Sequence, residues 1–223
     1  RREARADRVG LLGYCIGGTL SAIHTALEPD SVGGLVNLAG PIDFSEGGML
    51  AHMVNPKWFD PQVMADAGNI GAQQMQSGFT SLRPTAQLGK WLSFFDRLGD
   101  EQRMQAFEAL EGGASANIPF PGAAYARYIR ELYQENALVR GTHYVAGRRV
   151  NLEEIRCPVL TVVTDRDVIC PPPAAQALND LSASVDKSLL VIPGGHVGAV
   201  VGGSAPKQLY PKLAEWFART LKN

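Results

Sequence analysis

The sequence is poor in cysteine, and the few it has show no recognisable spacing. Its 223 residues include three cysteines, Cys15, Cys157 and Cys170, and none of them forms a CxxC or CxxH pattern. An odd number of cysteines without metal-ligand spacing indicates neither a disulfide framework nor a zinc site, and it fits a reducing cytosol. We therefore expect a cytoplasmic protein without a bound metal, in which Cys157 and Cys170 pack as small apolar residues.

Long apolar runs and an excess of one charge are also missing. No stretch is long enough to span a bilayer, and the chain does not open with a charged-then-apolar signal segment. The formal net charge is -1 and no run of Lys or Arg is present, which disfavours nucleic acid and anionic membranes as partners. With 45% hydrophobic residues, the chain has the balance of a globular domain, and small-molecule chemistry is the favoured class of function.

Short apolar runs alternate with helical patterns, which predicts an α/β fold. Val9–Tyr14 and residues 32–39 are expected strands, and residues 19–27 between them have helical spacing. This strand-helix-strand order predicts a parallel sheet. The alternation returns in the last third of the chain, with two expected strands and two expected helices at residues 158–164, 173–181, 188–192 and 207–221.

The middle of the chain has a different character, mostly helical and broken by proline and glycine. We expect one catalytic domain in three segments: a core at residues 1–40, a mainly helical cap insertion at 41–150, and a second core segment at 151–223. Several aromatic residues of the insertion are predicted to form its own core, with an apolar acyl-binding surface as the alternative: Trp58, Trp91, Phe94 and Phe95.

Gly13-Tyr14-Cys15-Ile16-Gly17 matches the G-x-nucleophile-x-G turn, with Cys in the place of Ser. The turn falls between an expected strand and an expected helix, where its strained backbone pushes the central side chain out above the sheet edge. A helix N-terminus favours a thiolate, and the Ile16 amide would supply one oxyanion donor. The alternative is a structural cysteine in a glycine-rich turn.

Two later residues lie in the order that this turn requires, an acid after one strand and a His after the last. Asp167 follows the expected strand at 158–164, and His196 lies in a glycine-rich loop after the final strand. Open α/β sheets place their sites at these carboxyl ends. We predict that His196 takes the proton of Cys15 while Asp167 orients the imidazole, with Asp165 as the rival for the acid.

These residues and their surroundings resemble the catalytic domain of polyhydroxyalkanoate (PHA, PHB) synthases, members of the α/β-hydrolase superfamily. The similarity runs from RVGLLGYCIGGT around Cys15 to the C-terminal helix, and includes YIRELYQEN at residues 128–136 and PGGHVGAVVG at 193–202. The resemblance implies an α/β-hydrolase fold, with a mostly parallel sheet, helices on both faces and a large helical cap. It also implies that Cys15 is acylated, that Asp167 rather than Asp165 is the acid, and that His196 is the base.

The function implied by the resemblance is acyl transfer. Such an enzyme takes an (R)-3-hydroxyacyl group from its CoA thioester onto the cysteine and passes it to a growing polyester chain, releasing CoA. No cofactor is expected to be bound. The implied partners are the hydroxyacyl-CoA substrate, the polyester and either a homodimer partner or a second synthase subunit, at the surface of a cytoplasmic granule. The upstream strands that normally complete the sheet and supply a second oxyanion amide are expected to be missing from this chain.

Two departures from the family pattern accompany the resemblance. Val168 follows the acid where members often carry His, and the glycine-rich residues 111–117 stand where the cap commonly has Trp and Asp. The alternatives are a Cys-dependent hydrolase, such as an intracellular polyester depolymerase or thioesterase, and a non-catalytic granule-associated partner. Cys15 and Asp167 are separated by roughly a hundred residues more than two or three ordinary βα units need, which requires a cap and excludes a small capless hydrolase.

Overall fold

A four-stranded parallel sheet in the order β1-β2-β5-β6 forms the centre of the fold. The computed structural model describes residues 6–82 and 118–221. The sheet strands are β1 (Val9–Tyr14), β2 (Val32–Leu38), β5 (Val159–Thr164) and β6 (Lys187–Ile192). All four lie within one residue of their predicted bounds. The runs of β5 and β6 end directly before Asp165 and Pro193, residues that favour turns.

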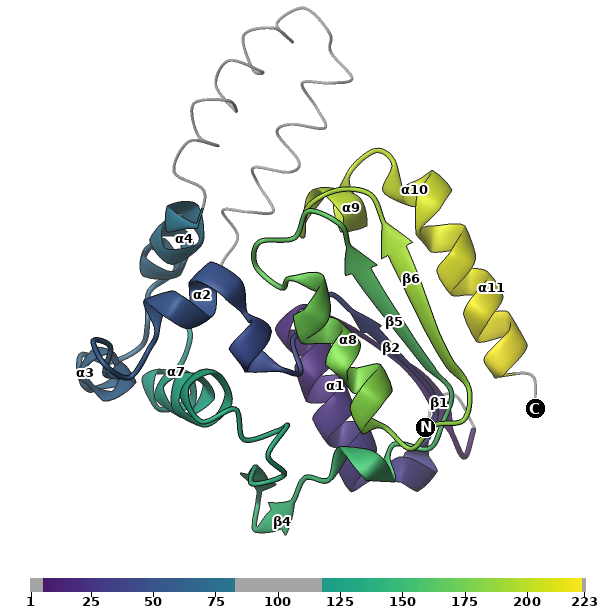
Figure 1. The fold of residues 1–223 in the computed structure, drawn as a ribbon, viewed down its shortest axis with the longest axis horizontal. Coiled ribbons are helices and arrows are strands. Elements are labelled where there is room, and N and C mark those ends of the chain that lie inside the picture. Colours follow the sequence, from purple (N-terminus) through teal and green to yellow (C-terminus); the bar gives the residue numbers. More distant parts are fainter. Residues whose placement is uncertain (1–5, 83–117, 222–223) are drawn as a thin grey trace, which may run out of the picture.

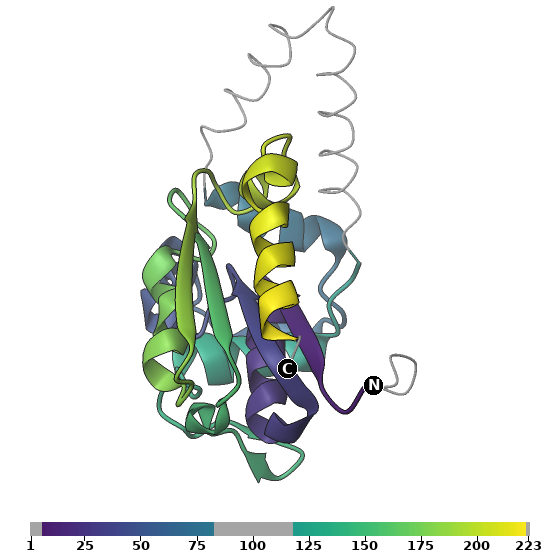
Figure 2. The same cartoon turned by 90° about the vertical axis from the view of Figure 1, so that its right-hand side faces the viewer.

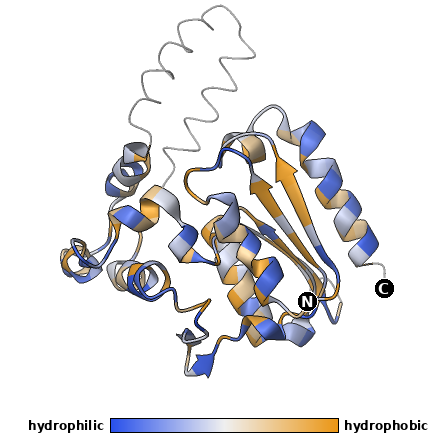
Figure 3. Cartoon of the chain, viewed as in Figure 1, coloured by the Kyte–Doolittle hydropathy of each residue, from blue (hydrophilic) through white to orange (hydrophobic). Residues whose placement is uncertain are grey.

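Helices cover both faces of this sheet (Figures 1 and 2). One face carries α1 (Ile16–Leu27) and α8 (Pro172–Leu181), and the other carries α11 (Tyr210–Thr220). Leu35 of β2 packs on the side of α1 and α8, whereas its neighbour Val36 packs on the side of Trp216 in α11. Successive residues of the buried strand β2 therefore serve two cores, and the central strands β2 and β5 are mostly apolar (Figure 3). The predicted fold class, an α/β-hydrolase fold with helices on both faces, is confirmed.

The sequence predicts a single helix at residues 207–221, but the structure does not have one continuous helix there. The chain instead forms α9 (Gly198–Val201), α10 (Ala205–Gln208) and α11, and Leu209 with φ −104 separates the last two. Pro211 lies in the first turn of α11, where its missing N–H has no partner to lose. Because proline could not continue a helix already running from α10, a new helix begins there.

Between β2 and β5 the chain forms short helices that lie to one side of the sheet (Figure 1). In chain order after η1 (Pro29–Ser31) and β2, these elements are η2 (Phe44–Glu46), α2 (Gly48–Met53), α3 (Pro61–Asp66), α4 (Ala72–Ser81), α7 (Gly122–Arg127) and the π-helix η3 (Tyr128–Gln134). A small antiparallel hairpin, β3 (Tyr144–Val145) and β4 (Arg148–Arg149), and η4 (Leu152–Glu154) lead back to β5. No helix among the described residues could cross a bilayer.

Side-chain amides fasten these helices to the core. Asn136 donates from Nδ2 to Asp43 over 2.9 Å and accepts the Phe44 N–H over 3.1 Å, which joins the end of η3 to the loop after β2. Gln134 donates to the carbonyl oxygens of Val54 and Phe59, both over 2.9 Å. The helices therefore have a defined place beside the carboxyl ends of the strands.

Trp58 does not belong to a core, contrary to its prediction. Its side chain is 56% exposed, its ring packs against the His52 ring with centroids 4.8 Å apart, and Nε1 donates to the His52 carbonyl. This local pairing satisfies the indole without burial. Trp91, Phe94 and Phe95, which carried the same prediction, lie outside the described residues.

Candidate active site

Cys15 occupies a strained turn between β1 and α1. Its φ of 56° and ψ of −128° place a residue with a side chain in a region that normally favours glycine. The surrounding fold holds it there, because the Cys15 N–H donates to the Leu38 carbonyl over 3.0 Å and the Gly18 N–H donates to the Cys15 carbonyl over 2.9 Å. The sequence motif predicted a strained turn at this residue, and the backbone has one.

Asp167 and His196 are in direct contact after β5 and β6. His196 Nδ1 lies 2.7 Å from Asp167 Oδ2, with the carboxylate fully buried and the imidazole side chain 6% exposed. The carboxylate also accepts the N–H groups of Ile169 and Cys170, both over 2.9 Å, and the Thr164 hydroxyl over 3.0 Å. Four donors therefore fix the carboxylate in one orientation toward the imidazole.

The two groups shift each other's pKa. Burial alone would raise the pKa of Asp167, but the hydrogen bond and charge of His196 and the two backbone N–H groups hold it below its usual value. Burial alone would lower the pKa of His196, but its hydrogen bond to Asp167 and its interaction with Cys15 raise that pKa to about 9. An ion pair between carboxylate and imidazolium is the result at neutral pH.

The other imidazole nitrogen belongs to a ring that stacks on Tyr14, the residue directly before Cys15. Nε2 of His196 is buried and makes no hydrogen bond of ordinary geometry to any residue within 6–82 or 118–221. The Cys15 side chain nevertheless interacts with this imidazole closely enough to raise its pKa. The three residues selected from the sequence thus come together at the carboxyl ends of β1, β5 and β6.

Asp165, the rival for the acid, contacts a different group. Its side chain is 47% exposed, and its Oδ1 accepts the Gly194 N–H over 2.7 Å. Asp167 is therefore the carboxylate that touches the imidazole of His196.

A cavity of about 220 Å³ adjoins Cys15 and Ile16, the first residue of α1. Its walls are mostly apolar and come from η3, from the helices between β2 and β5, and from nearby loops. They include Leu50, Val54, Ile70, Met75, Phe120 and Ile129. Because these residues are spread over 80 positions of sequence, no single motif could reveal the cavity.

Three tyrosines contribute phenol groups to the cavity: Tyr125, Tyr128 and Tyr133. Tyr128 and Tyr133 both line it, and Phe44 packs edge-on against both rings at centroid distances of 5.9 and 4.7 Å. Burial raises the pKa of both tyrosines well above the usual value, so they stay neutral and can donate hydrogen bonds. In the sequence, residues 128–136 indicate a family resemblance, and the spacing of the tyrosines does not predict a site.

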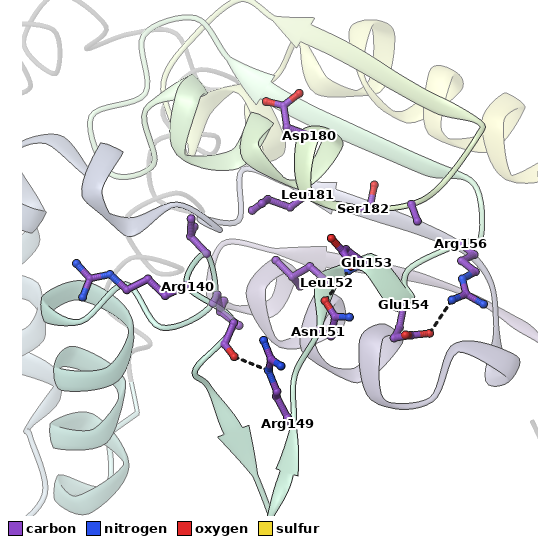
Figure 4. A pocket seen from close by; sticks show the side chains of 14 residues that line it. Arg140, Arg149, Asn151, Leu152, Glu153, Glu154, Arg156, Asp180, Leu181 and Ser182 are labelled. Atoms are coloured by element: carbon purple, nitrogen blue, oxygen red, sulfur yellow. Dashed lines mark hydrogen bonds and ion pairs between the residues drawn. The ribbon is translucent and has the colours of Figure 1, made fainter.

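A larger, polar hollow of about 660 Å³ lies elsewhere, among residues 138–141, η4 and the end of α8 (Figure 4). Its charged side chains are of both signs and partly paired with one another: Arg156 lies 3.1 Å from Glu154, and Arg149 donates to the Gly141 carbonyl. Since its walls precede β5 and β6, it lies at the amino ends of these strands, away from Cys15. The smaller apolar cavity is therefore the candidate substrate site.

Across the described residues, no group of three or more His, Cys, Asp or Glu side chains could hold a metal ion.

A parallel sheet with a strained nucleophile turn after one strand and an Asp-His pair after two later strands defines an α/β-hydrolase-type protein. Solved structures agree on this fold. The monoacylglycerol lipase of Paleococcus ferrophilus matches 98% of this chain and 71% of its own, with a TM-score of 0.52 and 15% identity. An acetylester hydrolase of Corynebacterium glutamicum matches 94% and 61%, with a TM-score of 0.55 and 17% identity. At such identities the likeness concerns the fold alone.

Residues 69–220 match the family described as "PHB de-polymerase C-terminus", and the chain belongs to this family. The poly(3-hydroxyalkanoate) polymerase subunit PhaC of Allochromatium vinosum is 34% identical over 218 residues, which cover 96% of this chain and 61% of that protein. The protein of the same name from Haloferax mediterranei is 30% identical over 221 residues, covering 98% and 45%. The predicted resemblance to polyhydroxyalkanoate synthases is confirmed, and the chain spans about half to three fifths of the length of these curated relatives.

Proposed function

We propose that this chain carries the acyl-transfer site of a poly(3-hydroxyalkanoate) polymerase, with Cys15 as the residue acylated by (R)-3-hydroxyacyl-CoA. The observation that carries the proposal is the buried Asp167–His196 pair facing Cys15 at a strained turn. The names of the relatives support the substrate class. The Asp–His pair by itself would support a cysteine-dependent enzyme without indicating its substrate.

In the first step the Cys15 thiolate attacks the carbonyl carbon of the hydroxyacyl-CoA thioester. The new C–S bond to Cys15 forms as the bond to the CoA sulfur breaks, and the His196 imidazolium donates its Nε2 proton to the departing CoA sulfur. Asp167 holds the Nδ1–H side of the ring, so that Nε2 faces the reaction. The Ile16 N–H, in the first turn of α1 and free of an intrahelical partner, would stabilise the oxyanion.

In the second step the now neutral imidazole takes a proton from the terminal hydroxyl of the polyester chain. That oxygen attacks the acyl group on Cys15, an ester bond forms, and the C–S bond to Cys15 breaks. The cysteine leaves as a thiolate and the imidazolium is restored, so both are ready for the next CoA thioester. The polyester chain gains one hydroxyacyl unit in each cycle, and the hydroxyl of the added unit is the acceptor in the next. No redox partner is needed.

The cavity beside Cys15 suits the acyl part of this substrate. Its apolar walls can accept the hydrocarbon portion, and the neutral phenols of Tyr128 and Tyr133 can donate to an ester or hydroxyl oxygen. We further propose that residues 41–150 act as the cap over the core segments at 1–40 and 151–223. A cap would limit the access of water, which competes with the polyester hydroxyl for the acyl-enzyme.

The wider setting belongs to the same proposal. The relatives are named as subunits, which supports a homodimer partner or a second subunit for the protein in which this chain functions. Growing polyester as the second substrate supports a place at the granule surface in the cytoplasm. Sedimentation of the protein with and without hydroxyacyl-CoA would measure its oligomeric state directly.

Incubation of the protein with 3-hydroxybutyryl-CoA, followed by mass spectrometry of protein and products, tests the function. We expect a hydroxybutyryl adduct on Cys15 that turns over to ester oligomers. Turnover to free 3-hydroxybutyrate alone would instead support the hydrolase alternative. Absence of any adduct would overturn both enzymes and favour a non-catalytic partner.

A pair of cysteine variants makes the assignment specific. Cys15→Ala should abolish the adduct, whereas Cys157→Ala should leave it unchanged, because burial raises the pKa of Cys157 to about 11 and suppresses its thiolate. An adduct that persists in Cys15→Ala and disappears in Cys157→Ala contradicts the assignment.

A further inference from the structure

The loop that carries His196 has little regular structure of its own. β6 ends at Ile192 and α9 begins only at Gly198, and between them Gly194 adopts a φ of 133°. An imidazole on such a loop keeps its place only if other residues hold the loop. Two side chains do so, and neither belongs to the proposed triad.

Tyr14 holds the loop from the nucleophile side. Its hydroxyl donates to the His196 carbonyl over 3.0 Å, and its ring stacks on the imidazole with centroids 5.0 Å apart and an interplanar angle of 28°. Burial and the nearby Cys15 and Asp167 raise the pKa of this phenol, so it remains a donor. Because Tyr14 immediately precedes Cys15, one residue fixes the imidazole relative to the nucleophile.

Asp165 holds the same loop from the acid side. Its carboxylate accepts the Gly194 N–H over 2.7 Å, and the adjoining backbone contributes two more bonds: Asp165 N–H to the Ile192 carbonyl and Arg166 N–H to the Gly194 carbonyl. These contacts continue the β5–β6 pairing past the ends of the strands. Asp165, the alternative candidate for the acid, therefore contacts the backbone of the His196 loop, whereas Asp167 contacts the imidazole itself.

We propose that Tyr14 and Asp165 are positioning residues that hold the His196 imidazole between Cys15 and Asp167. Tyr14 acts through the ring stack and the carbonyl of His196, and Asp165 acts through the backbone of Gly194. Neither forms or breaks a bond in the proposed reaction. The inference rests on the proposed role of His196 as the base.

Alkylation of Cys15 by iodoacetamide tests this without any acyl substrate, because only the thiolate reacts. The rate is measured from pH 5 to 9, with the site identified by mass spectrometry. The titratable or charged groups on the loops and strands that meet His196 are these: Cys15, Asp165, Arg166, Asp167 and Tyr14. At pH 6 the native protein should be alkylated faster than His196→Ala, which lacks the imidazolium beside Cys15.

Tyr14→Leu removes both contacts and should lower the alkylation rate at pH 6 about a hundredfold, as expected for an ångström-scale displacement of a catalytic group. Its rate at pH 9 should approach that of the native protein. Tyr14→Phe keeps the stack and loses one neutral hydrogen bond, so a loss of about two- to tenfold is expected. Recovery by Phe distinguishes positioning of the ring from a need for the hydroxyl itself.

Asp165 is tested in the same way. Asp165→Ala should shift the pH profile in the direction of Tyr14→Leu, and Asp165→Asn should restore most of it, because an amide oxygen can still accept the Gly194 N–H. Tyr210→Phe is the matched control: its hydroxyl also donates to a backbone carbonyl, that of Val200, but outside the site. It should leave the profile unchanged.

The outcomes separate the two proposals. Profiles of Tyr14→Phe, Tyr14→Leu and Asp165→Ala that superimpose on the native one, while His196→Ala differs, would overturn the positioning role and leave the base assigned. A His196→Ala profile identical to the native one would overturn the proposed triad itself. Should Tyr14→Leu fail to fold, Tyr14→Phe and Asp165→Ala decide the question.

Discussion

His196 Nδ1 and Asp167 Oδ2 lie 2.7 Å apart in a contact that solvent hardly reaches. An imidazole and a carboxylate at this distance form a charge-assisted hydrogen bond, stronger than a neutral one. Burial would otherwise oppose the charge on both groups, so each depends on the other for its ionisation. Changes to one member should therefore affect both chemistry and stability.

Asp167→Asn should lower the rate of Cys15 acylation by about 10³- to 10⁴-fold with a small effect on KM, because an amide can donate to Nδ1 and favours the wrong imidazole tautomer. Stopped-flow release of CoA from 3-hydroxybutyryl-CoA measures the rate. Asp180→Asn, at an exposed aspartate of the polar hollow, is the matched control and should retain native activity. Retention of more than about a tenth of the activity by Asp167→Asn contradicts its role.

The ion pair should also make stability depend on pH. The folded pKa of His196, about 9, exceeds its unfolded value of about 6.5, so its contribution is complete below about pH 6.5 and is lost as pH rises through 9. The pKa of Asp167 is lowered on folding, so its contribution is complete above about pH 3.9 and is lost at more acidic pH. The difference in Tm between the native protein and Asp167→Asn should therefore be largest near pH 5 to 6 and shrink by pH 9.5.

Thermal unfolding followed by fluorescence over pH 5 to 10 measures this difference. The offset between native and Asp180→Asn should stay constant over the same range. An Asp167→Asn offset as large at pH 9.5 as at pH 6 would show that the ion pair is not the source of the stability.

Local pattern was enough to predict the sheet and the places of the three candidate residues. Each strand is a mainly apolar run, and the positions of Asp167 and His196 followed from the rule that sites lie after the carboxyl ends of strands. The contacts of Tyr14 and Asp165 with the His196 loop could not be read in this way. They join residues 182 and 29 positions apart, and only the packed fold decides which side chains meet there.

Two errors have local causes. The break between α10 and α11 was readable from Pro211, which a helical pattern at residues 207–221 overrode in the prediction. Trp58 was assigned to a core because large aromatic residues usually bury, yet a hydrogen bond and a ring contact with its neighbour His52 satisfy it at the surface.

The cavity beside Cys15 should respond to filling at Gly78. This residue of α4 lines the cavity, and a Cβ added to it would meet no atom of the described residues within 4 Å. Gly78→Ala should keep activity and stabilise the helix by about 1 kcal/mol. Gly78→Leu should fold equally well but lower kcat/KM, with a greater loss for 3-hydroxyhexanoyl-CoA than for 3-hydroxybutyryl-CoA. Equal kcat/KM for the native and Leu proteins on both thioesters would exclude this cavity as the acyl site.

The two glycines of the Gly13-Tyr14-Cys15-Ile16-Gly17 turn should differ in their tolerance of alanine. A Cβ at Gly13 would lie 2.1 Å from the Gly17 carbonyl oxygen, which is backbone and cannot move aside, whereas a Cβ at Gly17 would meet nothing within 4 Å among the residues described. Gly13→Ala should cost about 1–3 kcal/mol and reduce acylation, because the turn must open to admit the methyl group. Gly17→Ala, within α1, should be neutral or stabilising by about 1 kcal/mol and keep acylation near native. Chemical denaturation together with the rate of adduct formation measures both effects. An equal loss in the two variants would mean that the close approach of Gly13 to Gly17 does not set the geometry of Cys15.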